Sequence, residues 1–288
     1  MIAWSGIFVR LAELPPATSA FLRCAYAVPL LAGLAWYRVR SGRASVLTAR
    51  QRAWGVAAGL CFGADLLLWH VSIGSIGAGL ATLLGNTQVL IVPLAAWALW
   101  RERPGVHQLA ALPLLAAGVL LIAGVGSSSA FGGAPLLGAL TGGLTGVAYA
   151  GFLLCLRAGR VGAGEVPVGA LAISTCVAAL VAAVAGGLTG TLDLKPSWPA
   201  HGWMVLLAVL CQVLAWLLIA TSLVRIEAAR VSMVLLLQPV AALVLGVLVL
   251  AEAPSVLQWV GATIVLIGIA AGAPRRTAPE PVQPAQPA

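Results

Sequence analysis

The sequence predicts an all-α integral membrane protein, a ten-helix bundle of two inverted five-helix repeats in which the first helix is truncated. Composition is the first reason, because 61% of the 288 residues are hydrophobic and only 8% are charged, with a mean hydropathy of +1.04. A soluble domain carries roughly a quarter charged residues, since water must solvate its surface. Lipid must therefore cover most of this chain. The other two reasons are a series of apolar segments of membrane-spanning length and an internal repeat.

Nine apolar segments approach or exceed the roughly 20 residues that a helix needs to cross a bilayer. Inside lipid the backbone must satisfy its own hydrogen bonds, so these segments are expected to be helical in spite of their Gly and Pro residues. In chain order they are 16–37, 53–71, 76–100, 106–125, 134–156, 166–187, 203–224, 229–250 and 256–273.

The two ends of the chain depart from this pattern. Residues 2–9 are apolar, but Arg10 and Glu13 end the segment. Such a helix reaches only about 12 Å, under half of the hydrocarbon thickness. We expect a short first helix that fails to cross the bilayer, which indicates a truncated N-terminus or a misplaced start codon. The polar, Pro-rich residues 274–288 are expected to form a disordered tail.

Positive charges are distributed unequally between the loops. The chain has 16 Lys and Arg residues. When the short first segment is counted as a helix, thirteen of them fall on one side of the membrane, and only Arg10, Arg23 and Lys195 do not. Cytoplasmic loops carry an excess of Lys and Arg, so the arginine-rich side and the C-terminus are predicted to be cytoplasmic. The charges form no basic face, so the net charge of +8 does not predict nucleic-acid binding.

An internal repeat relates the two halves of the chain at an offset of 150 residues. Polar residues are scarce here, so Gln, Glu and Pro residues that coincide at one offset are not expected by chance. The aligned pairs are Cys61 and Cys211, Ser72 and Ser222, Thr82 and Ser232, Gln88 and Gln238, Glu102 and Glu252, Pro104 and Pro254, Gln108 and Gln258, and Gly118 and Gly268.

The repeat divides the chain into residues 1–126 and 134–273, joined by a loop at 127–133 and followed by the tail at 274–288. Each half holds five helices. Because five is odd, the halves are expected to insert with opposite orientations. Inverted repeats are a common design of secondary transporters, in which the two halves exchange roles around a site near the midplane.

Two stretches then resemble a known family. ATLLGNTQVLIVPLAAWALWRERPGVHQLAALPLLAAGVLLIAG, from Ala81, and ARVSMVLLLQPVAALVLGVLVLAEAPSVLQWVGATIVLIGIAAG, from Ala229, resemble the end of an EamA-type domain of the drug/metabolite transporter superfamily. The matching features are a proline within a helix, a glutamate just beyond it and a Gly-containing final helix. GIFVRLAELPPATSAFLRCA, from Gly6, resembles the first helix pair of that family.

The resemblance implies ten helices, with helices one to four and six to nine around a central cavity and helices five and ten peripheral. Members of the family export or import amino acids, other metabolites and drugs. The peripheral helices five and ten would then be free to form a homodimer. The short first helix is a departure from the family pattern and affects one wall of the cavity.

Asp65 and Arg23 are ionisable residues inside predicted helices. Each costs about 3 kcal/mol to insert, and such residues usually face a cavity or a partner. At 1.5 Å per residue both lie roughly 10 Å below the outer interface, on adjacent antiparallel helices, so an ion pair is expected. The pair is either a fixed strut or a substrate or proton site at which Asp65 exchanges partners. The third alternative is that the two residues never meet.

Helical spacing places further polar and aromatic residues on shared faces, because residues three or four apart lie one above the other. For the amides, a bond across a helix interface is the alternative to ligand contact. The candidate substrate-binding residues are Arg23, Tyr26, Asp65, Trp69, Thr82, Asn86, Tyr149, Gln212 and Trp216.

A second group is predicted to be structural. Gln88 lies about 200° around the helix from Asn86, so it is expected to bond across an interface. The repeated glutamates are expected to bond a neighbouring helix end. His70 is expected to be wet or loop-bonded near the outer interface, with a proton relay as the alternative. The structural candidates are Gln88, Gln238, Glu102, Glu252, Pro93 and Pro239.

The residue pattern argues against an enzyme. Intramembrane catalysis needs a nucleophile and base, a carboxylate pair or metal ligands, whereas Asp65 has no second carboxylate inside the membrane and no HExxH or GxSxG motif occurs. The five cysteines lack metal-ligand spacing, so neither a metal nor a cofactor is expected. A non-transporting membrane scaffold or sensor remains an alternative, although the tail is too short for a signalling domain.

The predicted function is therefore secondary transport, in the export direction, of small metabolites such as amino acids or amphiphilic compounds. The chain has no ATP-binding motif, so concentrative transport must be secondary, with protons as the expected coupling ion and uniport as the alternative. The strong preference for Arg over Lys, with abundant Ala and Gly, predicts a bacterium of high genomic G+C content and hence the cell membrane.

Overall fold

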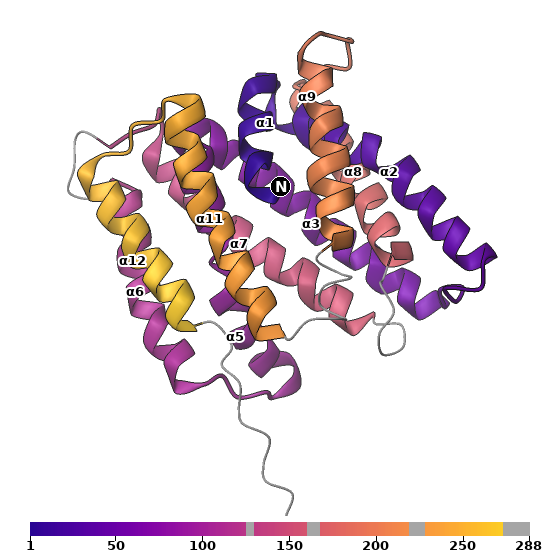
Figure 1. Cartoon of the computed structure of the whole chain (residues 1–288), viewed down its shortest axis with the longest axis horizontal. Coiled ribbons are helices and arrows are strands. Elements are labelled where there is room, and N and C mark those ends of the chain that lie inside the picture. The colour runs from indigo at the N-terminus through magenta and orange to yellow at the C-terminus, as the bar shows by residue number, and fades with distance from the viewer. Residues whose placement is uncertain (125–129, 160–167, 219–227, 273–288) are drawn as a thin grey trace, which may run out of the picture.

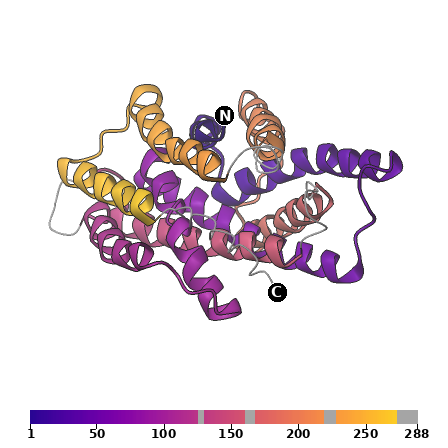
Figure 2. The same ribbon diagram turned by 60° about the horizontal axis from the view of Figure 1, so that its bottom comes forward.

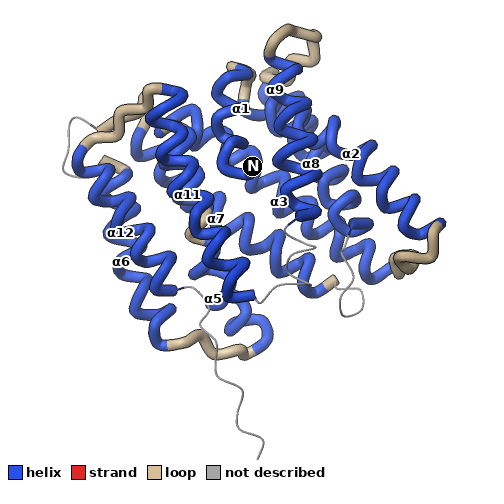
Figure 3. The backbone as a smooth tube through the Cα atoms, viewed as in Figure 1, coloured by secondary structure: helices blue, strands red, loops and turns tan. Residues whose placement is uncertain are grey.

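The computed structural model describes residues 1–124, 130–159, 168–218 and 228–272, with only the backbone described for 228–236. Every regular element in these ranges is a helix, as Figure 3 shows. Six apolar helical segments are long enough to cross a membrane, and four shorter ones complete the set. The predicted ten-helix membrane bundle is thereby confirmed.

The elements follow the two predicted halves in chain order. The first half contains the 3₁₀-helix η1 (Ile2–Trp4), α1 (Ser5–Ala12), α2 (Pro16–Arg40), α3 (Ala49–Ile76), α4 (Ala78–Gly85), α5 (Gln88–Trp100) and α6 (Val106–Ile122). The second half contains α7 (Pro135–Ala158), α8 (Val168–Thr189), α9 (Ala200–Leu206), the π-helix η2 (Leu207–Leu214), α11 (Ala228–Leu250) and α12 (Val256–Gly272).

Two helices extend beyond their predicted ends for local reasons. The first helical segment continues to Ala12, where Glu13 adopts a left-handed backbone conformation with φ of 52° and ends α1. At the start of α3, the Thr48 hydroxyl accepts a hydrogen bond from the Gln51 backbone N–H, and the Gln51 side chain accepts one from the Thr48 N–H. This capping box satisfies backbone donors that the helix itself cannot satisfy. It therefore fixes the start of α3 four residues before the predicted one.

The predicted single helix over 76–100 is wrong in one respect, because it is interrupted between α4 and α5. At the interruption the Asn86 side-chain nitrogen donates to the Thr82 carbonyl over 2.8 Å. The backbone N–H groups of Asn86 and Thr87 donate to the carbonyls of Leu83 and Leu84, three residues earlier, and not only to the fourth residue as in an α-helix. Asn side chains compete with the backbone for such carbonyls. The regular α-helical hydrogen bonding is therefore interrupted at Asn86, although Ala78–Trp100 still forms one segment of membrane-spanning length.

The predicted helix over 203–224 also differs from an ordinary α-helix. It begins earlier, at Ala200, and passes from α9 into the π-helix η2. A π-helix holds more residues per turn than an α-helix, and such turns occur frequently at functional sites. The change of pitch alters which side chains of this segment face the centre of the bundle.

The packing of α6 against α12 shows how the halves are related. A Cβ atom added at Gly118 would lie 2.7 Å from the carbonyl oxygen of Gly261, and one at Gly268 would lie 3.6 Å from that of Ala111. Residues 118 and 268, and residues 111 and 261, are equivalent in the repeat, so the two contacts are reciprocal, as a two-fold relation requires. The later residue of α6 meets the earlier residue of α12, so the helices are antiparallel. The halves are therefore inverted, as predicted.

Local geometry repeats as well. Arg101 and Ala251 are equivalent residues that both adopt left-handed backbone conformations, with φ of 58° and 52°, at the ends of α5 and α11. Gln108 and Gln258 each accept a hydrogen bond from the backbone N–H three residues earlier, over 2.9 and 3.0 Å. Non-glycine residues with positive φ are uncommon, so their recurrence at one offset is a structural signature of the repeat.

The helices form a bundle with its two equivalent final helices at one edge. Figure 1 shows α6 and α12 side by side at this edge, while α2 and α8 pack together at the opposite edge. The short α1 lies between α9 and α11 and contacts both. In the turned view of Figure 2, these three helices lie along one side of the bundle and α7 along the other.

Candidate functional site

Arg23, on α2, is a buried cation at the centre of a group of polar side chains. It is 6% exposed, and its Nη2 atom donates a 2.9 Å hydrogen bond to the side-chain oxygen of Gln212. Its guanidinium carbon lies 5.6 Å from the centroid of the Trp69 ring, in a cation–π arrangement. The Nε atom has no hydrogen-bond partner among the described residues. The guanidinium is therefore held in place but retains a free donor.

Asp65, on α3, is 7% exposed and interacts electrostatically with Arg23. No ion pair of 4.0 Å or shorter joins the two side chains, and no described residue donates a hydrogen bond to the carboxylate. The expected direct ion pair is therefore not formed, because Gln212 supplies the acceptor for Arg23. Asp65 remains a buried acid near an opposite charge, without a bonded partner in the described part of the chain.

Gln212 reaches Arg23 from the π-helix η2. Its side chain is fully buried, and its amide nitrogen has no hydrogen-bond partner among the described residues. Cys211, beside it in η2, is also buried. A buried amide donor without a partner is costly. Together with Nε of Arg23, it gives the centre of the bundle two unused donors.

An aromatic wall lies next to these charges. Tyr149, on α7, interacts electrostatically with both Asp65 and Arg23. Its ring centroid lies 6.2 Å from that of Trp216 and 5.9 Å from that of Phe152. Aromatic faces of this kind suit both the apolar part and the positive charge of a ligand.

Six of the nine candidate substrate-binding residues are thus linked in one group. These are Arg23, Asp65, Trp69, Tyr149, Gln212 and Trp216. The aromatic wall also contains Phe152 and, stacked 4.7 Å from it, Phe62, neither of which the sequence had singled out. Helical spacing was the available signal, because Phe152 lies three residues after Tyr149 and Phe62 three residues before Asp65.

The other three candidates make different contacts. The Tyr26 hydroxyl bonds Nδ1 of His201 over 2.6 Å and so connects α2 to α9. The Thr82 hydroxyl is buried without a partner among the described residues, and Asn86 bonds the Thr82 backbone. No hydrogen bond or ring contact among the described residues joins these three side chains to Arg23 or Asp65. Their role in binding stays a prediction.

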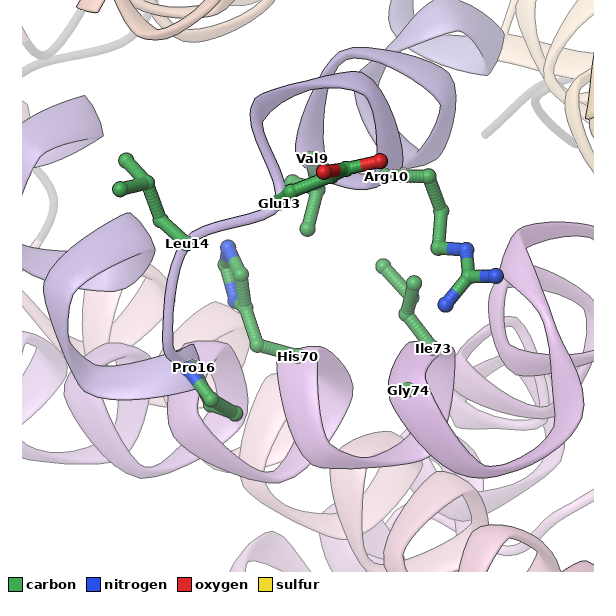
Figure 4. Close-up of a pocket in the computed structure, with 8 residues that line it drawn as sticks. All are labelled: Val9, Arg10, Glu13, Leu14, Pro16, His70, Ile73 and Gly74. Atoms are coloured by element: carbon green, nitrogen blue, oxygen red, sulfur yellow. The ribbon is translucent and has the colours of Figure 1, made fainter. Parts of the chain in front are cut away.

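His70 differs from the expected wet or loop-bonded histidine. It is 2% exposed, and its Nδ1 bonds the Leu66 carbonyl of its own helix over 2.6 Å. Its Nε2 has no partner among the described residues. Figure 4 shows His70 rising from α3 toward Glu13, at a pocket of about 400 Å³ between α1 and α3. The residues lining it are Val9, Arg10, Glu13, Leu14, Pro16, His70, Ile73 and Gly74.

The repeated glutamates lie at opposite ends of the bundle. Glu252 lies in the α11–α12 connection and Glu102 in the α5–α6 connection, and Figure 1 shows these two connections at opposite ends. We call these ends the Glu252 face and the Glu102 face. Glu252 is 4% exposed and accepts hydrogen bonds from the backbone N–H groups of Ala78 and Gly79. Glu102, 49% exposed, makes a two-pronged ion pair with Arg157.

The remaining structural candidates have simpler surroundings. Pro93 lies within α5 and Pro239 within α11. Gln88 and Gln238 are half-buried, and their proposed bonds across helix interfaces stay predictions. No group of three or more metal-ligating side chains occurs within residues 1–124, 130–159, 168–218 and 237–272.

The sequence profile of the EamA-like transporter family matches residues 1–124 and 136–271. No curated protein gives a significant match. One protein of known crystal structure is similar with a TM-score of 0.58 and 19% sequence identity, over 94% of this chain and 93% of that one. At this identity the similarity supports the fold alone.

Proposed function

The chain belongs to the EamA-like transporter family, and on that premise we propose that it exports small zwitterionic or amphiphilic metabolites, such as amino acids, by secondary transport. Family membership makes it a multi-pass membrane transporter of the drug/metabolite transporter superfamily. The substrate class, the export direction and the coupling to protons are the proposal.

The observation that carries the proposal is a pair of buried opposite charges without a direct bond between them. Asp65 has no bonded partner in the described chain, and Arg23 retains an unused Nε donor. Buried charges in a membrane protein are costly unless a partner compensates them. A substrate with an ammonium and a carboxylate group would supply both partners at once. The aromatic rings of Trp69, Tyr149 and Trp216 would contact its apolar part.

This arrangement also supports proton coupling. An ammonium group and a proton both neutralise the carboxylate of Asp65, so they compete for it. Release of substrate would then accompany uptake of a proton, and the exchange would couple export to an inward proton gradient. Because the halves are inverted, the site can open alternately to either side of the membrane by exchange of their roles.

The unequal distribution of arginines supports the orientation. Cytoplasmic loops are enriched in Lys and Arg, so the proposal places the Glu102 face and the C-terminus in the cytoplasm and the Glu252 face outside. Substrate would enter from the Glu102 face during export. The cell membrane of a bacterium is the proposed location, as the codon-driven preference for arginine suggests.

The test is exchange transport by the purified full chain in sealed liposomes. Radiolabelled leucine is loaded inside, and its exit is measured with and without an inward proton gradient. Unlabelled leucine, its amide and its N-acetyl derivative then compete in separate experiments. The proposal requires leucine to compete better than either derivative, because each derivative lacks one charge. Equal competition by all three, or no transport of any amino acid in a panel, would contradict it.

Comparative metabolomics extends this test to substrates outside the panel. Medium from cells that express the wild-type chain is compared with medium from cells that express Asp65→Asn. Metabolites enriched only by the wild-type chain are the candidate substrates. Enrichment restricted to molecules without a basic nitrogen would remove the role proposed for Asp65.

A further inference from the structure

The last turn of α5 is an exposed apolar surface that ends in a pair of arginines. The exposed fractions of Trp97, Leu99 and Trp100 are 49%, 64% and 40%. Arg101 and Arg103 follow directly and are also exposed. Figure 1 shows this end of α5 at the Glu102 face of the bundle. An apolar surface next to positive charge fits an anion that carries an apolar chain.

A pocket of about 390 Å³ lies where the apolar surface meets the arginines, and it is lined by Trp97, Ala98, Arg101 and Arg103. Successive residues of a helix rise by 1.5 Å, so Arg101 lies about 6 Å beyond Trp97 along α5. Tryptophan rings favour the boundary between the hydrocarbon and the headgroups of a bilayer. With Trp97 at this boundary, the two guanidinium groups lie at the level of the lipid phosphates.

The two arginines that line the pocket are not neutralised by the acid between them. Glu102 instead accepts from both terminal nitrogens of Arg157, and these bonds hold the pKa of Glu102 below its ordinary value. The guanidinium carbon of Arg157 also lies 4.6 Å from the centroid of the Trp100 ring. Among the described residues, no carboxylate lies within ion-pair distance of Arg101 or Arg103. The pocket thus carries two positive charges that a phosphate group would neutralise.

The internal repeat shows that the fold of this turn does not need the side chains of the pocket. The second half has apolar residues at the positions equivalent to Trp97, Arg101 and Arg103, namely Val247, Ala251 and Ala253. Ala251 nevertheless adopts the same left-handed backbone conformation as Arg101. The turn therefore has its shape without arginine, and the charge at this end of α5 is available for binding.

We propose that this pocket binds the phosphate of an anionic phospholipid, whose acyl chains lie along the exposed apolar turn of α5. Arg101 and Arg103 donate hydrogen bonds to the phosphate oxygens, and Trp97 contacts the glycerol region and the beginning of the chains. A soluble phosphate would be held by the arginines alone, whereas a lipid uses both parts of the surface. The proposed site does not depend on which substrate the chain transports.

Lipid binding to the purified full chain in a neutral detergent tests the proposal. Native mass spectrometry counts the lipid molecules bound at graded concentrations of phosphatidylglycerol, with uncharged phosphatidylcholine as the reference. The melting temperature is a second readout, because a bound lipid stabilises the folded chain. The first phosphatidylglycerol should bind roughly 10- to 30-fold more tightly than phosphatidylcholine, since each arginine near a phosphate contributes a factor of about five.

Two double variants with the same change of charge locate the site. Arg101→Gln with Arg103→Gln should remove the preference for phosphatidylglycerol and the rise in melting temperature. Arg50→Gln with Arg52→Gln is the matched control, because these exposed arginines at the start of α3 lie on the same face but do not line the pocket. The control should bind phosphatidylglycerol like the parent chain.

Equal losses in the two double variants would show that the lipid responds only to the net charge of the face, and the proposal would be wrong. Glycerol 3-phosphate carries the charge without acyl chains, so it should not displace phosphatidylglycerol at the same concentration. Displacement would show that the pocket takes a soluble phosphate and would overturn the lipid assignment. Trp97→Val introduces the residue of the second half and should weaken the binding of both lipids, whereas unchanged binding would remove the role proposed for the apolar surface.

Discussion

Arg23 and Gln212 are joined by a 2.9 Å hydrogen bond between α2 and the π-helix η2, and they come from opposite halves of the chain. The bond fixes the guanidinium by a neutral amide and leaves Asp65 without a direct ion pair. A neutral anchor satisfies part of the hydrogen-bonding capacity of the cation but none of its charge. The charge of Arg23 thus remains available to a ligand.

Asp65→Asn should reduce leucine exchange by roughly 10- to 100-fold, the loss expected when a charge-assisted hydrogen bond is removed. Membrane insertion should be unaffected, because Asn has nearly the same shape as Asp. Exchange in liposomes with matched amounts of protein measures the effect. Asp193→Asn, at an exposed loop position, is the control and should exchange normally. Normal exchange by Asp65→Asn across the pH range would show that Asp65 is only a strut.

Arg23→Ala should lower the thermal stability of the detergent-solubilised chain. The change removes the opposite charge near Asp65 and the donor to Gln212. Adding Asp65→Asn should recover part of the loss, with a coupling of about 0.5–3 kcal/mol, because no carboxylate is then left uncompensated. A double-mutant cycle from melting temperatures measures this coupling. Strictly additive effects would show that the two charges do not interact.

Gly118→Ala should destabilise the fold by about 1–3 kcal/mol through overpacking. The added Cβ would lie 2.7 Å from the Gly261 carbonyl oxygen, so α6 and α12 would have to separate. Gly143→Ala is the control, because a Cβ added there, inside α7, meets nothing within 4 Å. It should be neutral or stabilising by about 0.5–1 kcal/mol. Equal melting temperatures for the two variants would contradict the close contact of α6 with α12.

A reporter fused after Arg276 should read as cytoplasmic. Thirteen of the 16 Lys and Arg residues fall on that side when ten helices are counted. Paired fusions of alkaline phosphatase and green fluorescent protein measure the location, because each is active on only one side of a bacterial membrane. High phosphatase activity without fluorescence would overturn the orientation and exchange the assignments of the Glu102 and Glu252 faces.

The sequence predicted the features that depend on composition and periodicity. The helical segments and the inverted repeat could both be derived from composition and spacing. The direct pairing of Arg23 with Asp65 could not be decided in this way, because depth along a helix does not specify its rotation. Gln212 was recognised as a candidate, but its selection as the partner of Arg23 depends on the packing of α2 against η2.

The interruption at Asn86 and the π-helix at Gln212 were also out of reach. Both features depend on which carbonyl each backbone N–H group bonds. The pattern of apolar and polar residues does not determine this choice. The different states of Glu102 and Glu252 are a further case. Equivalent residues predict equivalent roles, whereas Glu252 bonds the start of α4 and Glu102 pairs with Arg157.

The π-helix η2 has a consequence for how such a site can diverge. A π-helical segment holds an extra residue over the same turns, so deleting one residue from Leu207–Leu214 would restore α-helical winding and leave later side chains facing as before. Trp216 would then keep its place beside Tyr149, and only side chains inside the segment, such as that of Gln212, would change direction. A one-codon deletion in a segment that holds the anchor of Arg23 could thus give a descendant a different substrate range in a single event.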